Sequence, residues 1–72
     1  MPNLSGVSGH RAVKALQRLG FVVLRQKGSH VMLRRNDRGC VVPMHREINP
    51  WTLAGVLKQA GVNVDEFLRA LK

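Results

Sequence analysis

The segment FVVLRQKGSHVMLRR, residues 21–35, predicts a β-hairpin. Residues 21–26 are β-branched and apolar enough for a strand, and residues 29–35 alternate between apolar and polar side chains, as half-buried strands do. Between them, Lys27-Gly28 predicts a two-residue turn, because glycine adopts the positive φ that tight hairpins need. An antiparallel sheet is therefore the expected basis of the fold.

The second strand of this hairpin separates its side chains onto two faces. Val31 and Leu33 point to one face, whereas His30, Met32 and Arg34 point to the other. We expect the first face to join the core. His30 then lies exposed at the rim of the sheet, directly after the turn.

Further elements are predicted on both sides of the hairpin. Residues 1–7 are expected to lie loosely on the surface. The other segments are a helix from the cap Ser8 to about Leu19, a polar turn at 36–39, a third strand from Cys40 to Met44 with Pro43 at its end or at a sheet edge, a helix from Pro50 to Gly61 capped by Asn49, and a last short helix opened by Asn63.

The resulting order is α-β-β-β-α with a short terminal helix. Antiparallel strands joined by short turns, with helices on one face, predict a two-layer α+β domain. The chain has 72 residues, which is the length of a single domain spanning residues 1–72.

The charge balance points to an anionic partner. The chain carries 12 Lys and Arg against 4 Asp and Glu, a formal charge of +8, which favours nucleic acid, an anionic membrane or an acidic protein. The longest apolar run is too short for a membrane segment, and the N-terminus lacks the hydrophobic stretch of a signal peptide. The single cysteine, Cys40, excludes an internal disulfide and a cysteine-based zinc site. We therefore expect the protein to reside in the cytoplasm, which is reducing.

His30 is the candidate catalytic residue. A strand histidine taken at random most often simply faces solvent, but this one follows a turn, lies opposite the core face and has many cationic neighbours. An imidazole exchanges protons near neutral pH, and cations stabilise charge on a reacting phosphate. RNA fits this site because it supplies its own nucleophile, the 2′-hydroxyl. The cations expected around His30 are Arg25, Lys27, Arg34, Arg35 and Arg38.

Two neighbours of His30 are assigned supporting roles. Ser29 is not expected to be a nucleophile, because adjacent strand residues point to opposite faces; it is a turn residue. Gly28 has a structural role and lets a phosphate approach the backbone.

His45 is either a loop histidine that bonds to the backbone or, if strands two and three pair closely, a second acid or phosphate ligand. His10 is assigned to solvent.

Metal and stacking sites are not expected. Three histidines at wide spacing, one cysteine and four scattered carboxylates form no ligand cluster, so no metal or other cofactor is predicted. Phe21 and Phe67 are expected in the core, and Trp51 is either a core residue or a partner contact. With so few aromatic residues, a single-strand reader of the RRM or OB type is not expected.

Across nearly its whole length the chain resembles the HicA family of bacterial toxin–antitoxin pairs. The segments that carry the resemblance are Ser8-Gly9, Leu19-Gly20-Phe21, Arg25-Gln26-Lys27-Gly28-Ser29-His30, Val42-Pro43-Met44-His45, Thr52-Leu53 and Leu57-Lys58-Gln59-Ala60-Gly61.

The resemblance implies a fold like that of double-stranded-RNA-binding domains. It also implies an mRNA interferase, an endoribonuclease that cleaves transcripts without a metal, and a HicB antitoxin that covers the active site. The family's catalytic histidine corresponds to His30, its Gly-Ser neighbours to Gly28 and Ser29, and its Pro-x-His element to Pro43 and His45.

Two other functions are compatible with the same residues. The first is a non-catalytic domain that binds double-stranded or structured RNA. The second is a scaffold whose basic face docks only on an acidic protein. Binding would depend on arginine and lysine side chains, whereas cleavage would also need His30.

Overall fold

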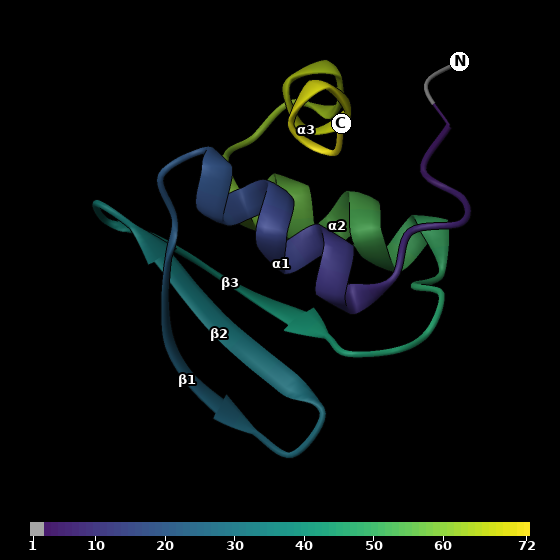
Figure 1. Ribbon diagram of the computed structural model, residues 1–72. Coiled ribbons are helices and arrows are strands. Elements are labelled where there is room, and N and C mark those ends of the chain that lie inside the picture. Colours follow the sequence, from purple (N-terminus) through teal and green to yellow (C-terminus); the bar gives the residue numbers. More distant parts are fainter. Residues whose placement is uncertain (1–2) are drawn as a thin grey trace.

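The computed structural model describes residues 3–72 and confirms the α+β class. Its elements are α1 (Gly9–Arg18), β1 (Val22–Lys27), β2 (His30–Arg35), β3 (Arg38–Pro43), α2 (Pro50–Ala60) and α3 (Val64–Ala70). The strands form one antiparallel sheet in the order β1-β2-β3. Helices α1 and α2 lie side by side over one face of the sheet, and α3 packs on them from the side away from the sheet (Figure 1).

The predicted core face of β2 is buried. Val31 and Leu33 are 4% and 1% exposed, and Cys40 and Val42 of β3 lie beside them in the register of the sheet. The helices cover this face, whereas most of the opposite face of β2 is open to solvent and that of β3 is partly covered toward its end. The other fully buried large side chains include Leu16, Ile48, Leu53, Leu57 and Phe67, and Phe21 is also in the core, as predicted.

All three helices begin at the caps that the sequence predicts. The side chains of Ser8, Asn49 and Asn63 each accept a hydrogen bond from a backbone N–H two or three residues further on, at 3.1, 2.9 and 2.9 Å. Gly61 ends α2 in the left-handed conformation, with φ of 71°. In the described part of the chain, no helix is both long and apolar enough to cross a membrane.

The first hairpin turn lies one residue later than predicted. Lys27 pairs with His30, so the two loop residues are Gly28 and Ser29 rather than Lys27 and Gly28. Gly28 has φ of 59° and is the only one of the two with a positive value. This is the pattern of a type II′ turn, which places glycine at the first loop position.

The second turn is also tighter than predicted. Arg35 pairs with Arg38, which leaves Asn36 and Asp37 as the loop and makes β3 begin at Arg38 instead of Cys40. Asn36 adopts φ of 55°, a conformation that asparagine tolerates better than most residues. Pro43 ends this edge strand, as its missing N–H predicts.

Strand β1 is more exposed than its apolar sequence suggests. Val22 and Leu24 are 62% and 58% exposed, because the helices pack against β3 while the main contacts of β1 are with β2. The register of β1 shifts between Val23 and Arg25. Such a bulge, together with cationic side chains on the strand, discourages pairing of the free edge with other chains.

The segment before α1 is packed, contrary to expectation. Leu4 and Val7 are buried, and the backbone N–H of Ile48 donates to the carbonyl of Val7 at 2.8 Å. The prediction of a loose surface segment is therefore wrong for residues 3–7, and its first two residues lie outside the described part of the chain. This segment ties the loop before α2 to the start of α1.

Candidate histidine site on the open sheet face

His30 and His45 lie together on the open side of the sheet. His30 is the first residue of β2 and pairs with Pro43, the last residue of β3. His45 follows Pro43 by two residues, and both imidazoles are exposed and line one depression of about 460 Å³. The structure thus meets the condition for a second histidine near His30, namely close pairing of β2 with β3.

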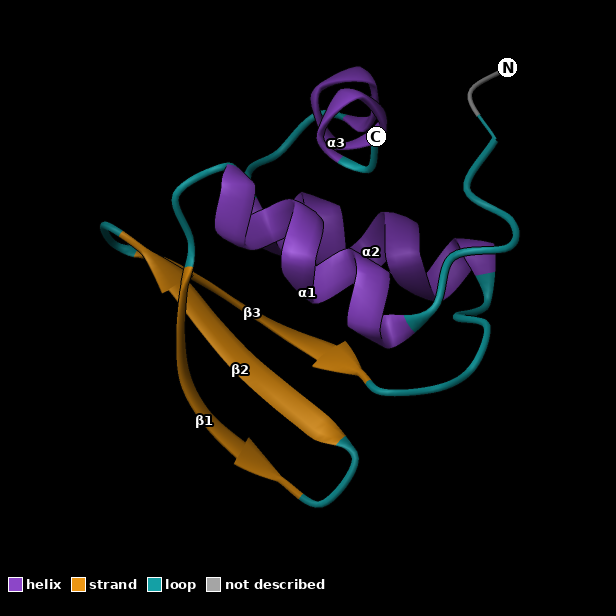
Figure 2. Cartoon of the chain, viewed as in Figure 1, coloured by secondary structure: helices purple, strands orange, loops and turns teal. Residues whose placement is uncertain are grey.

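The backbone around His45 is held from two sides. The N–H of Met44 donates to the carbonyl of Ser29 at 2.6 Å, and the N–H of Gly9 donates to the carbonyl of His45 at 2.9 Å. Figure 2 shows the loop after β3 leading toward α2. At Gly9 an added Cβ would lie 2.5 Å from the Pro43 carbonyl oxygen, so only glycine permits this approach.

Helix α2 forms the other wall of the depression. Thr52, Gly55, Val56 and Gln59 line it alongside the two histidines. None of these four residues was predicted from the sequence as part of the candidate site. The spacing of Thr52, Gly55 and Gln59 offered a signal, because it places small and polar residues along one side of a helix whose core side carries Leu53 and Val56.

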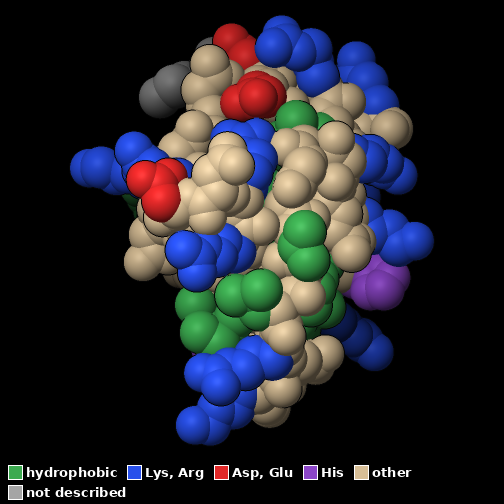
Figure 3. Space-filling model, turned by 90° about the vertical axis from the view of Figure 1, so that its left-hand side faces the viewer, with side chains coloured by type: hydrophobic (Ala, Val, Ile, Leu, Met, Phe, Trp, Pro, Cys, Tyr) green, Lys and Arg blue, Asp and Glu red, His purple; other side chains and the backbone are tan. Residues whose placement is uncertain are grey.

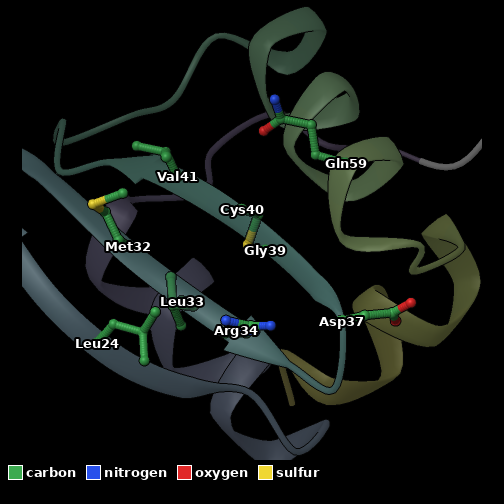
Figure 4. Close-up of a pocket in the computed structure, with 9 residues that line it drawn as sticks. All are labelled: Leu24, Met32, Leu33, Arg34, Asp37, Gly39, Cys40, Val41 and Gln59. Carbon is green, nitrogen blue, oxygen red and sulfur yellow. The ribbon is translucent and has the colours of Figure 1, made fainter.

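A second depression continues the first along the sheet. It has a volume of about 490 Å³, and Val41 and Gln59 line both depressions. Figure 4 shows Met32 and Val41 on the strands, Gln59 on the helix, and Arg34 and Asp37 toward the far end. We call the two depressions together the sheet groove. It leads from the histidines to Arg34.

Three of the predicted cations lie on the same side of the sheet as His30. Lys27 pairs directly across from His30. The Arg25 side chain lies over Met32, with its Nε donating to the Met32 Sδ at 3.2 Å. Arg34 lines the far end of the sheet groove, about 13 Å from His30 at the usual rise of about 3.3 Å per strand residue.

The other two predicted cations are not brought to the histidines. Arg35 lies on the core face, where its Nη1 donates to the Leu19 carbonyl at 2.8 Å and its guanidinium stacks 4.7 Å from the centre of the Phe21 ring. The guanidinium of Arg38 lies against Gly61 at the end of α2. These contacts give Arg35 and Arg38 roles in joining the helices to the sheet.

Positive charge is spread widely over the molecule. Figure 3 shows Lys and Arg side chains across the whole of one face, with a strip of hydrophobic side chains between them and few carboxylates. Asp37 is the one carboxylate that lines the sheet groove in the described residues. Arg34 lines the same end of the groove as Asp37, so the two charges offset each other there.

The groove offers neither a nucleophilic thiol nor a metal cluster. Burial raises the pKa of the Cys40 thiol from 9.0 to about 11, so the thiol stays protonated and unreactive at neutral pH. Within residues 3–72, no group of three or more His, Cys, Asp or Glu side chains lies close enough to hold a metal ion. The two exposed imidazoles are the remaining side chains of the groove that can both accept and donate a proton.

Comparison with known proteins identifies the family. No curated protein matches the chain. The family model described as the HicA toxin of bacterial toxin–antitoxin systems matches residues 9–62, three quarters of the chain, and this region runs from the first residue of α1 past the end of α2. It includes both histidines and the entire sheet groove. The chain therefore belongs to the HicA family of toxins.

Proposed function

We propose that this toxin is an endoribonuclease that cleaves mRNA, with His30 as the catalytic residue. The observation that supports this function is the shared depression of His30 and His45 at one end of an open groove. Two imidazoles supply a proton acceptor and a proton donor near neutral pH. RNA supplies the remaining reactant, its 2′-hydroxyl.

The proposed reaction transfers the phosphate within the RNA strand. His30 accepts the proton of the 2′-hydroxyl while the 2′-oxygen forms a bond to the adjacent phosphorus. The bond from phosphorus to the 5′-oxygen breaks, and His45 donates a proton to that oxygen. The products are a 2′,3′-cyclic phosphate and a 5′-hydroxyl end, and the reaction needs no metal ion or other cofactor.

The residues around the histidines stabilise this reaction. Lys27 and Arg25, on the same side of the sheet, offset the negative charge that develops on the phosphate. The Gly28-Ser29 turn places His30 at the rim and lets the RNA backbone come close. The formal charge of +8 steers RNA to the surface, and Arg34 extends the phosphate contacts along the groove. Arg35 contributes through packing.

The family also implies an antitoxin partner, which we propose is a HicB-type protein. The depression is open to solvent, so the toxin needs a cover that keeps transcripts out. We expect both proteins to act in the cytoplasm, where the mRNA is. Expression of the toxin alone should arrest growth, and the antitoxin should relieve the arrest.

Histidine substitutions test the function. His30→Ala should lower RNA cleavage by about 10²- to 10⁴-fold, the usual contribution of an acid–base group, while RNA affinity changes little. His45→Ala should lower cleavage as well. The matched control is His10→Ala, because His10 is exposed on α1 and lies outside the groove.

The same assay separates the non-catalytic alternative. An RNA-binding domain without activity would bind RNA with a strong salt dependence and leave it whole, with or without His30. A scaffold for an acidic protein would show no salt-dependent affinity for RNA. Cleavage by His30→Ala at the parent rate would overturn the proposed mechanism.

A further inference from the structure

Trp51 is the most exposed large hydrophobic side chain in the described part of the protein. It is 86% exposed, which rules out the core position that the sequence left open. Its backbone N–H is held by the Asn49 cap at 2.9 Å, so the residue sits on a well-ordered first turn of α2. A large indole held on a rigid helix and left in solvent is a ready contact surface for a ligand.

The position of Trp51 places it at the rim of the sheet groove. The next residue, Thr52, lines the depression together with His30 and His45. Residues four apart on a helix are neighbours, and Trp51, Gly55 and Gln59 form such a row, of which Gly55 and Gln59 line the groove. Trp51 is not itself a lining residue, but it lies one turn before Gly55 in this row, at the N-terminal end of α2.

Gly55 keeps this row open. An added Cβ at Gly55 would have no atom within 4 Å, so nothing fills the space between Trp51 and Gln59. Long helical side chains lean toward the helix N-terminus, and no side-chain atom of Trp51 lies within 4 Å of the position of a Gly55 Cβ. The exposed indole of Trp51 is thus followed, one turn along the helix, by a position without a side chain, Gly55.

We propose that Trp51 is a stacking site for one nucleobase next to the cleaved phosphate. This site deepens the proposed function and rests on it. A strand whose phosphate lies between His30 and His45 has its neighbouring bases at the groove rim. A base stacks on an exposed indole whatever its sequence, because every base has an aromatic face. Trp51 would then position the strand without selecting a base strongly.

The single tryptophan of the chain provides a direct readout. We would titrate His30→Ala, which keeps the RNA whole, with a 12-nucleotide single-stranded RNA and follow the indole fluorescence. Stacking should quench the emission in step with binding. Inorganic polyphosphate, which has charge but no bases, should bind without comparable quenching. Binding of the RNA without a change in emission would overturn the proposal.

Substitutions then measure what the indole contributes. In the His30→Ala background, Trp51→Ala should weaken RNA affinity by about 5- to 150-fold, the range for a base–aromatic stack, and leave polyphosphate affinity unchanged. Trp51→Phe should restore part of this loss and Trp51→Leu much less. Thermal unfolding should be the same for all variants because the side chain is exposed.

The outcomes separate this proposal from the function on which it rests. If the parent chain cleaves RNA and Trp51→Ala binds and cleaves it equally well, the stacking site is wrong and the function stands. The stacking site is also wrong if Trp51→Ala changes only the affinity for a protein partner, because Trp51 would then be a protein contact. If RNA quenches Trp51 but the parent chain never cleaves, the stacking site stands and the function falls. If the chain does not bind RNA, both are wrong.

Discussion

The contact between Gly9 and the loop that carries His45 yields a quantitative prediction. In Gly9→Ala the new Cβ would lie 2.5 Å from the Pro43 carbonyl oxygen and 2.6 Å from the Met44 Cα. Both are backbone atoms and cannot rotate away, and the gap is about 1 Å shorter than a relaxed contact of about 3.5 Å. The loop must therefore move, and the 2.9 Å hydrogen bond from Gly9 to His45 must lengthen.

The expected loss of stability follows from these two effects. Overpacking costs about 1–3 kcal/mol, and a weakened backbone hydrogen bond adds up to about 1 kcal/mol, part of which the better helix propensity of alanine offsets. A net loss of about 1–3 kcal/mol corresponds to a fall in the unfolding midpoint of about 5–20 °C in a domain of this size. Displacing His45 by about 1 Å should also lower RNA cleavage by up to about 10²-fold.

Thermal unfolding followed by circular dichroism, with a cleavage assay at a temperature where both proteins are folded, checks this prediction. The matched control for stability is Gly55→Ala, the same change within a helix, where no atom lies within 4 Å of the new Cβ; only its unfolding is compared, because Gly55 lines the groove. That variant should gain about 0.5–1 kcal/mol. A Gly9→Ala protein as stable and as active as the parent would refute the reasoning about this contact.

The other predictions concern two arginines and the buried thiol. Arg34→Ala should reduce the slope of log RNA affinity against log salt concentration by about 0.7 for single-stranded RNA, with little change in stability. Arg35→Ala should leave this slope unchanged and lower the unfolding midpoint, because it removes the hydrogen bond to the Leu19 carbonyl and the stacking contact with the Phe21 ring. The reverse pattern, in filter binding and thermal unfolding, would contradict their placement. Because burial raises the pKa of Cys40 from 9.0 to about 11, the unfolded chain releases this proton first as the pH rises. The stabilising contribution of the protonated thiol is complete below pH 9 and is lost as the pH rises to about 11. Between these pH values, the free energy of unfolding measured in urea should therefore fall less for Cys40→Ala than for the parent. The folded protein should also react slowly with thiol reagents at neutral pH, and fast labelling without unfolding would contradict the burial of this side chain.

The order of elements and the faces of β2 could be predicted because they depend on local patterns. Alternation alone separates Val31 from His30, whichever residues form the turn, and cap residues such as Ser8 and Asn49 mark helix starts through bonds within one turn. Both turns differ from their predicted positions. Asn36 adopts a positive φ of 55°, which permits a two-residue loop where the polar sequence indicated a longer one.

The parts that the sequence did not predict depend on contacts between distant segments. Arg34 and Arg35 are identical and adjacent, so strand alternation places them on opposite faces. The partner of Arg35, the Leu19 carbonyl, depends on where α1 ends and could not be read from the sequence. The exposure of β1 has a similar origin, because its apolar residues match a buried strand but the helices lie over β3. Gly9 gave no sign of its role, since its close approach is to a loop more than thirty residues away.

The sequence predicted that His45 would lie near His30 only if the second and third strands paired closely. Pairing of His30 with Pro43 meets that condition, and the hydrogen bond from Gly9 holds the loop that follows. The wall formed by α2 is the main part of the candidate site that the sequence did not predict. Thr52 and Gln59 are unremarkable polar residues until the helix is laid beside β3, where they complete the groove.

The most direct test of the proposed chemistry is the identity of the ends that cleavage leaves. We would treat an RNA oligonucleotide with the toxin in EDTA and analyse the fragments by mass spectrometry, next to the same oligonucleotide with a single 2′-deoxyribose at the cleaved position. Attack by the RNA's own hydroxyl predicts 2′,3′-cyclic phosphate and 5′-hydroxyl ends, and no cut at the deoxyribose. Fragments with 5′-phosphate ends, or equal cutting at the deoxyribose, would contradict it.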